Sequence, residues 1–195
     1  MLYIVRHGET VWNKEGKIQG QCDSPLTSKG IEQAKHYSKI LTYHVMKDHN
    51  IGDFDFVVSP LQRTQHTAKI ILDSLGLKKK IVLEPLAKEK NNGIWEGKHY
   101  TIFEEHYSKQ QDKWNYQHKD EESQEIFYNR VNKLLTKYKN KKTILVTHGG
   151  VSLYLRAIIT RTNKNFDEMV SQHGWQRQDE IFHVKNNVDV IKLKI

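Results

Sequence analysis

Short apolar runs alternate with longer segments of helical periodicity along most of the chain. The apolar runs are rich in β-branched and aromatic residues and predict strands at residues 2–5, 53–59, 81–83 and 143–147. Apolar residues at helical spacing predict helices over residues 28–47, 61–75, 100–111, 122–138 and 150–160, with a short one near 166–171. Alternation of apolar and polar residues predicts a closing hairpin from segments 181–184 and 188–194.

Strands that alternate with helices form right-handed crossovers and a mostly parallel sheet with helices on both faces. We therefore predict an α/β fold, a three-layer α/β/α sandwich. A chain of 195 residues fits one domain, residues 1–195. Residues 8–26 and 85–98 carry glycines and little apolar periodicity, so they predict long loops, which in compact domains are usually functional.

The net charge of +8 favours anionic partners. Lysine supplies most of this charge, and its runs at 78–80 and 139–142 fall between predicted elements, as solubilising surface residues do. We therefore expect a small phosphorylated substrate as partner, with no nucleic acid and no membrane. Cys22 is the single cysteine, and the first residues lack the pattern of a signal peptide, so we expect a cytoplasmic protein.

Two of the predicted strands each end in a histidine followed by glycine. His7 follows the first strand and His148 follows the strand at 143–147. Arg6 precedes His7, and Arg63 comes shortly after the strand at 53–59. Because the carboxyl ends of parallel strands share one edge of a sheet, we expect these four side chains to lie together.

This set of side chains suits phosphate chemistry. Guanidinium groups match phosphate oxygens in pairs, and an imidazole can attack phosphorus. The glycines at 8, 149 and 150 allow backbone N–H groups to approach the same anion, and His148 directly precedes the amino terminus of a predicted helix. The sequence therefore predicts phosphate binding followed by transfer to histidine, while its Lys and His spacing indicates no metal site.

Five short motifs follow one another along the chain. They are RHGET at 6–10 with Asn13, QG at 19–20 with Asp23 and PLT at 25–27, SPL at 59–61 with RT at 63–64, WEG at 95–97 after Glu89, and VTHGG at 146–150. In this number and order they resemble the histidine phosphatase superfamily, in its phosphoglycerate mutase-like branch. The similarity covers nearly the whole chain.

The resemblance implies a phosphoglycerate mutase-like fold with a lid-like insertion at about residues 98–121. It also implies a two-step transfer in which His7 is the nucleophile and becomes phosphohistidine. Glu89 matches the acid that protonates the leaving oxygen, although Glu84 and Glu96 lie in the same neighbourhood. The groups expected to bind the transferring phosphoryl are Arg6, Arg63 and His148. The further substrate contacts expected are Asn13, Gln19, Gly20 and Gly149, and neither a cofactor nor a metal is implied.

The expected function is a metal-independent phosphomonoesterase that acts on a small phosphorylated metabolite. The WEG segment resembles the phosphatases, and the stretch between Glu89 and His148 lacks the longer insertion typical of glycolytic mutases. A 2,3-bisphosphoglycerate-dependent phosphoglycerate mutase is the alternative, and a non-catalytic phosphate-binding protein is a third hypothesis; a homodimer is left open. Two departures bear on substrate choice: Glu121 replaces a glycine of the family pattern, and residues 177–180 lack an asparagine.

Overall fold

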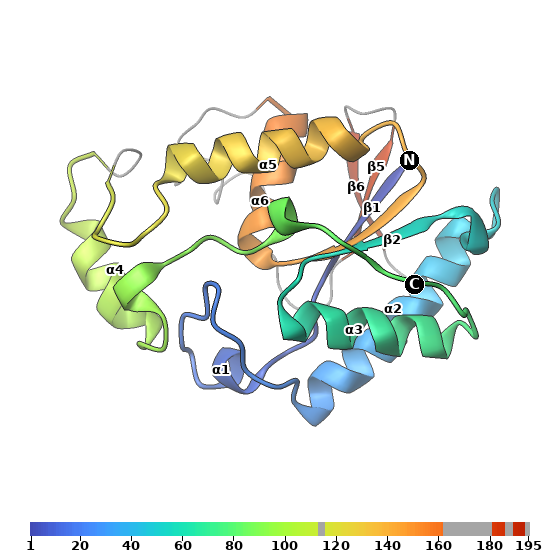
Figure 1. Ribbon diagram of the computed structural model, residues 1–195, viewed down its shortest axis with the longest axis horizontal. Coiled ribbons are helices and arrows are strands. Elements are labelled where there is room, and N and C mark those ends of the chain that lie inside the picture. The colour runs from blue at the N-terminus through green and yellow to red at the C-terminus, as the bar shows by residue number, and fades with distance from the viewer. Residues whose placement is uncertain (113–115, 162–180, 186–188, 194–195) are drawn as a thin grey trace.

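The computed structural model describes residues 1–112, 116–161, 181–185 and 189–193. Its centre is a six-stranded sheet in the order β3-β2-β4-β1-β5-β6 (Figure 1). The strands are β1 (Leu2–Arg6), β2 (Asp55–Val58), β3 (Val82–Leu83), β4 (Thr143–Thr147), β5 (Ile181–Lys185) and β6 (Asp189–Leu193). The first four pair in parallel, whereas β5 and β6 form an antiparallel hairpin that joins β1, so the sheet is mostly parallel and the closing hairpin is confirmed.

Helices cover both faces of this sheet. The helices that the structure describes are α1 (Val11–Lys14), α2 (Ser28–Val45), α3 (Gln62–Ser74), α4 (Tyr100–Ser108), α5 (Gln124–Tyr138) and α6 (Gly149–Ile159), and α2, α3, α5 and α6 supply the side chains that cover the sheet. Alternate residues of β1 point to opposite faces: Tyr3 and Val5 pack in the core under α2 and α3, and Leu2 and Ile4 in the core under α5 and α6. In Figure 1 these two pairs of helices lie on opposite sides of the strands. The three-layer prediction is therefore confirmed.

Three predicted segments differ from the observed ones. Residues 8–26 are not an unbroken loop, because Thr10 and Asn13 form a capping box that starts the single-turn helix α1. This turn buries no residue, so it has no apolar periodicity to reveal it. The strand predicted at 53–59 begins only at Asp55, because Asn50 caps a short 3₁₀ helix, η1 (Ile51–Asp53). The segment predicted as a loop at 85–98 contains η2 (Pro85–Ala87) and η3 (Gly93–Trp95).

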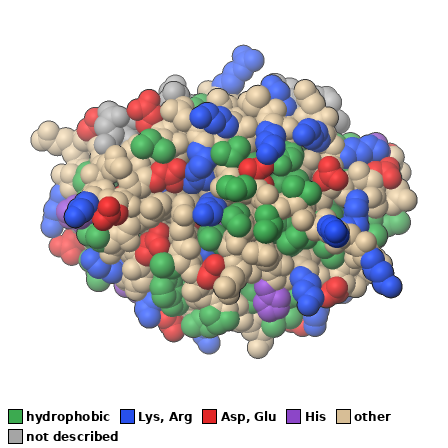
Figure 2. All heavy atoms as spheres, in the orientation of Figure 1, with side chains coloured by type: hydrophobic (Ala, Val, Ile, Leu, Met, Phe, Trp, Pro, Cys, Tyr) green, Lys and Arg blue, Asp and Glu red, His purple; other side chains and the backbone are tan. Residues whose placement is uncertain are grey.

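The surface agrees with the scattered lysines of the sequence. On the face drawn in Figure 2, Lys and Arg side chains are spread among acidic and apolar ones. Within the part of the chain that the structure describes, none of the helices combines the length and the apolarity needed to cross a membrane. The short helix predicted near 166–171 lies outside the described residues.

Candidate active site

The register of two neighbouring strands brings His7 and His148 together. Arg6 at the end of β1 pairs with Thr147 at the end of β4, so the histidines that follow them leave the sheet at the same level. The backbone N–H of His7 donates to the carbonyl of Thr147 at 3.0 Å. The two imidazole rings meet edge to face, with centroids 5.3 Å apart. The two histidines thus lie together, as predicted.

A tight turn follows His7, and only glycine fits it. A Cβ atom on Gly8 would collide with the carbonyl of Gly30 in α2. On its other side, the N–H of Gly8 donates to the hydroxyl of Thr67 in α3 at 3.1 Å. The turn is therefore held between two helices, and this fixes the position of His7 relative to α3.

Hydrogen bonds identify the tautomer of His7. Its Nδ1 lies 2.8 Å from the carbonyl oxygen of Gly8, which can only accept, so Nδ1 carries the proton. The Nε of Arg63 donates to Nε2 of His7 at 3.3 Å, so Nε2 presents a lone pair. His7 is therefore neutral, and Nε2 is the atom that can act as a nucleophile.

Burial and neighbouring cations keep both histidines neutral. His7 is 3% exposed, and burial lowers the pKa of its imidazole well below the usual 6.5, with the positive charges of Arg63 and Arg6 lowering it further. The pKa of His148 is also lowered well below 6.5, first by burial and then by Arg63. Both rings are therefore neutral at neutral pH, although they lie beside two arginines.

His148 follows β4 at the N-cap position of α6, and its ring faces Ser59. Its Nε2 lies 2.8 Å from Oγ of Ser59, the residue directly after β2. Its Nδ1 is buried and has no hydrogen-bond partner among the described residues. A buried polar atom without a partner is rare in a folded protein, and this one lies in the site where a phosphoryl oxygen is expected.

Arg63 is almost entirely buried, and the loop before α2 engages most of its guanidinium. Nη1 donates to the carbonyl of Cys22 at 2.6 Å and to Asp23 Oδ1 at 2.9 Å, and Nη2 donates to the carbonyl of Gly20 at 2.7 Å. With Nε on His7, four of the five N–H groups of an arginine are engaged within the described residues. Arg63 therefore places its positive charge beside His7 and also fixes the backbone of residues 20–23.

Arg6 lies against the amino terminus of α6. A Cβ atom on Gly149 would approach the guanidinium carbon of Arg6 to 3.3 Å, so a glycine at this position leaves room for the arginine. The same helix end offers backbone N–H groups and the positive end of its dipole. Arg6, His7, Arg63 and His148 thus come from three separate segments to one edge of the sheet, as predicted.

Glu89 reaches the same helix end. Its Oε2 accepts from the N–H of Gly150 at 3.0 Å, and its Oε1 accepts from the N–H of Lys90 at 3.0 Å. Its rivals have other partners. Glu84 accepts from Lys137 and Tyr138, while Glu96 accepts from backbone N–H groups of the loops. Of these three carboxylates, Glu89 is therefore the one that the structure places at the start of α6.

The predicted substrate contacts differ in their hydrogen-bond surroundings. Gln19 is buried beside the loop that holds Arg63, and its Oε1 has no hydrogen-bond partner within the described residues. Gly20 has a φ of +52°, and its carbonyl is bound by Arg63. Asn13 uses its amide oxygen in the capping box of α1, where it accepts from the N–H of Thr10 at 3.2 Å. Gly149 lies against Arg6, as described above.

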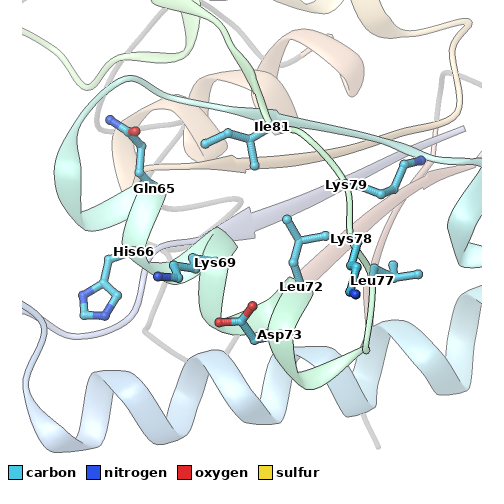
Figure 3. Close-up of a pocket in the computed structure, with 9 residues that line it drawn as sticks. All are labelled: Gln65, His66, Lys69, Leu72, Asp73, Leu77, Lys78, Lys79 and Ile81. Atoms are coloured by element: carbon cyan, nitrogen blue, oxygen red, sulfur yellow. The ribbon is translucent and has the colours of Figure 1, made fainter.

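A surface cavity of about 570 Å³ lies elsewhere, along α3 (Figure 3). It is lined by Gln65, His66, Lys69, Leu72, Asp73, Leu77, Lys78, Lys79 and Ile81. By helical spacing, its α3 residues lie on another side of the helix from Arg63 and Thr67, which contact the turn after β1. The cavity is therefore separate from the candidate active site.

Sequence and structure comparisons give the family. Residues 2–176 match the model of the histidine phosphatase superfamily (branch 1). The chain belongs to this superfamily. A protein of Enterobacter sp. (strain 638), named "Probable phosphoglycerate mutase GpmB", is 43% identical over 98 residues, which are 50% of this chain and 41% of that protein. The chain thus matches less than half the length of this curated relative.

Solved structures align over nearly the whole chain. The alpha-ribazole phosphatase from Shigella flexneri is 26% identical, covers 98% of this chain and 94% of its own, and has a TM-score of 0.73. The protein TTHB049 from Thermus thermophilus is 25% identical, with 100% and 99% coverage and a TM-score of 0.72. These similarities confirm the predicted fold.

Sequence reasoning assigned no role to two residues that organise this site. Ser59 holds His148, and Asp23 holds Arg63. Both stand in the motifs that indicate the family, and Ser59 is also the last residue of a predicted strand, where functional side chains are expected. Strand-end position could therefore have identified Ser59, whereas no local signal links Asp23 to α3.

Proposed function

We propose that this chain is a metal-independent phosphomonoesterase that acts on a small phosphorylated metabolite through a phosphohistidine intermediate. The observation that carries the proposal is the state of His7: a neutral imidazole whose Nδ1 is committed to Gly8 and whose Nε2 lone pair lies among cationic groups. A neutral nucleophile beside two arginines is what attack on a phosphate dianion requires.

In the first step, His7 Nε2 attacks phosphorus, and the bond between phosphorus and the ester oxygen breaks with its electron pair on that oxygen. Arg63 Nε donates to Nε2 in the free protein, so this N–H must turn to a phosphoryl oxygen when Nε2 forms its new bond. Glu89 acts as the general acid and gives its proton to the leaving oxygen. The Nδ1–H bond to Gly8 supports the positive charge on the phosphorylated ring.

In the second step, water attacks phosphorus while the bond to Nε2 breaks and the electron pair returns to His7. The Glu89 carboxylate accepts the proton of the attacking water, which restores its protonated form. The charge of the phosphoryl oxygens is spread over Arg6, Arg63 and the α6 amino terminus in both steps. Inorganic phosphate then leaves, and the site returns to its starting state.

The alternative is a phosphoglycerate mutase, in which phosphoglycerate rather than water takes the phosphoryl group. The name of the Enterobacter relative favours it, but that match covers half of this chain. The solved alpha-ribazole phosphatase is similar over 98% of this chain, which favours the phosphatase. A sugar or nucleoside phosphate is therefore the class to test first, with alpha-ribazole phosphate among its members.

Hydrolysis of 4-nitrophenyl phosphate in the presence of a chelator tests the proposal. We expect turnover together with an acid-labile phosphoenzyme, and we expect His7→Asn to lower turnover by about a thousandfold or more and to abolish the phosphoenzyme. His66→Asn, an exposed histidine on α3, is the matched control and should leave both unchanged. Undiminished turnover by His7→Asn would refute the mechanism.

Incubation with 3-phosphoglycerate and 2,3-bisphosphoglycerate separates phosphatase from mutase. Free phosphate as the main product supports the phosphatase, whereas net formation of 2-phosphoglycerate supports the mutase. A panel of phosphorylated metabolites assayed under the same conditions then ranks the leaving groups by kcat/KM. This ranking indicates the preferred substrate, which the transfer chemistry does not specify.

A further inference from the structure

Arg130, on α5, binds the backbone of the segment that carries Glu89. Its Nη1 donates to the carbonyls of Leu86 at 2.8 Å and Lys88 at 2.7 Å, and its Nη2 donates to the carbonyl of Glu89 at 3.1 Å. One guanidinium therefore spans the approach to the proposed acid.

Glu122 completes this clamp. Arg130 Nε donates to its Oε1 at 2.8 Å, and Nη2 donates to its Oε2 at 2.7 Å, which is a paired, two-bond geometry. The Oε2 atom also accepts from the N–H of Asn91 at 3.2 Å. Arg130 therefore binds backbone carbonyls at residues 86–89, and Glu122 binds the backbone N–H of Asn91, just after Glu89.

Every donor of Arg130 is used in this arrangement. A guanidinium has five N–H groups, and here they reach three carbonyls and the two oxygens of one carboxylate. The side chains of Arg130 and Glu122 are only 17% and 10% exposed, so water screens their attraction little. A lysine at this position, with its donors on one nitrogen, could not span the same set.

A second ion pair lies directly beside the first. Lys90 and Glu121 form a buried salt bridge, and each is the chain neighbour of a residue in the clamp region, Glu89 and Glu122. Glu121 is also the residue that departs from the family pattern. Two consecutive carboxylates thus bind this segment: Glu122 through Arg130 and the N–H of Asn91, and Glu121 through the side chain of Lys90.

The proposed acid depends on this support. Among the described residues, the Glu89 carboxylate is held by two backbone N–H groups, those of Gly150 and Lys90. The distance of this carboxylate from His7 and from the leaving oxygen therefore depends on the backbone path of residues 86–91. A displacement of about 1 Å in a reacting group can cost about a hundredfold in rate.

We propose that Arg130 and Glu122 are positioning residues that fix Glu89 for proton transfer to the leaving group. This inference rests on the proposed function, because it needs Glu89 to act as the acid. The loss of rate in variants of these residues should then depend on the leaving group. A misplaced acid slows esters whose alcohol needs a proton and spares esters whose leaving group departs as a stable anion.

Arg130→Lys and Glu122→Gln test the inference with two substrates, glycerol 2-phosphate and 4-nitrophenyl phosphate. We expect Arg130→Lys to lower kcat for glycerol 2-phosphate by about 10- to 100-fold and kcat for 4-nitrophenyl phosphate by less than about threefold. Glu122→Gln should show the same split. Inhibition by inorganic phosphate should be unchanged in both variants, because Arg6, Arg63 and His148 are intact.

Lys137→Met is the matched control. Lys137 is also on α5 and also pairs with a carboxylate of the neighbouring segment, Glu84, but it does not contact residues 86–91 in this way. We expect it to leave both rates unchanged. Thermal unfolding of all three variants gives the folded fraction, which corrects the rates for any lost protein.

Equal falls with both substrates, after that correction, would overturn the inference, since loss of folded enzyme acts on every substrate alike. Unchanged rates in both variants would also overturn it. Glu89→Gln, measured in parallel, separates this outcome from failure of the proposed function. If Glu89→Gln shows the substrate split and the clamp variants do not, the positioning role alone fails; if Glu89→Gln shows no split, the acid assignment fails with it.

Discussion

The hydroxyl of Ser59 lies 2.8 Å from Nε2 of His148, and the sheet fixes both groups. The N–H of Ser59 donates to the carbonyl of Val146 at 3.0 Å, so β2 and β4 carry the two residues to the same level. This contact orients the ring whose other nitrogen is buried without a partner among the described residues. An imidazole of the proposed phosphate site is thus held by the residue that follows another strand, β2.

Removal of this hydroxyl should impair both activity and stability. Ser59→Ala leaves Nε2 of a buried histidine without its partner, which costs about 1–3 kcal/mol in the free energy of unfolding. We expect kcat/KM for 4-nitrophenyl phosphate to fall by about tenfold, because His148 is no longer oriented. The control is Ser38→Ala, a buried serine on α2 that bonds the carbonyl of Lys35. A similar loss of kcat/KM in Ser38→Ala would contradict the specific role of Ser59.

The two buried histidines should make stability depend on pH. Their folded-state pKa values lie well below 6.5, so below that pH the unfolded chain binds protons that the folded protein does not. The free energy of unfolding should therefore fall as the pH drops below 6.5, by about 1–2 kcal/mol per pH unit for each histidine. Urea unfolding at pH 7.5, 6.5 and 5.5 measures this dependence. In the double variant His7→Asn with His148→Gln, the slope should be smaller, and an unchanged slope would assign the effect to other groups.

Gly150 should be intolerant of even one methyl group. A Cβ atom there would collide with Oε1 of Glu89, so Gly150→Ala must push the carboxylate away from the helix end. We expect hydrolysis of glycerol 2-phosphate to fall by about 10- to 100-fold, with a smaller loss for 4-nitrophenyl phosphate. Gly76→Ala is the control, because its Cβ meets nothing within 4 Å and only its φ of +66° is strained. It should cost about 1–2 kcal/mol of stability and leave both rates unchanged.

Asp23 should matter for substrate binding although it lies before α2. It accepts from the N–H of Gln62 at 2.7 Å and from the Arg63 side chain at 2.9 Å. The residue at the N-cap of α3, Leu61, makes no side-chain cap, so Asp23 supplies it from a distant loop. We expect Asp23→Ala to cost about 1–2 kcal/mol of stability and to raise KM, because Arg63 loses its anchor. Asp73→Ala, at the other end of the same helix, should change neither, and an equal rise in KM there would contradict the anchoring role.

Regular elements were predictable because their signals are local. Strand β1, with residues buried on both faces, and helix α2, with its buried side at helical spacing, follow directly from their apolar patterns. The helix α1 was missed because a capping box, not burial, creates it. The edge strand β3 was predicted, but its residues Val82 and Leu83 are 47% and 49% exposed, which their composition alone does not indicate.

The sequence by itself determined the chemistry at the strand ends. The strands predicted before His7 and His148 belong to a mostly parallel sheet, whose strand ends share one edge, so the two histidines and Arg6 could be placed together from the sequence. The order of the motifs also indicated the superfamily, which the match over residues 2–176 confirms. These conclusions depend on periodicity and chain order, which a single sequence carries.

Only the tertiary structure decided which groups meet across the loops. It placed Glu89 rather than Glu84 or Glu96 at the start of α6. It assigned the proton of His7 to Nδ1, so that Nε2 keeps its lone pair. It also joined Arg130 to the backbone at Glu89. Such contacts join segments far apart in sequence and depend on the path of irregular loops, where no periodic pattern operates. The reaction expected here follows from local sequence, whereas the geometry that would make it efficient follows from packing between distant segments.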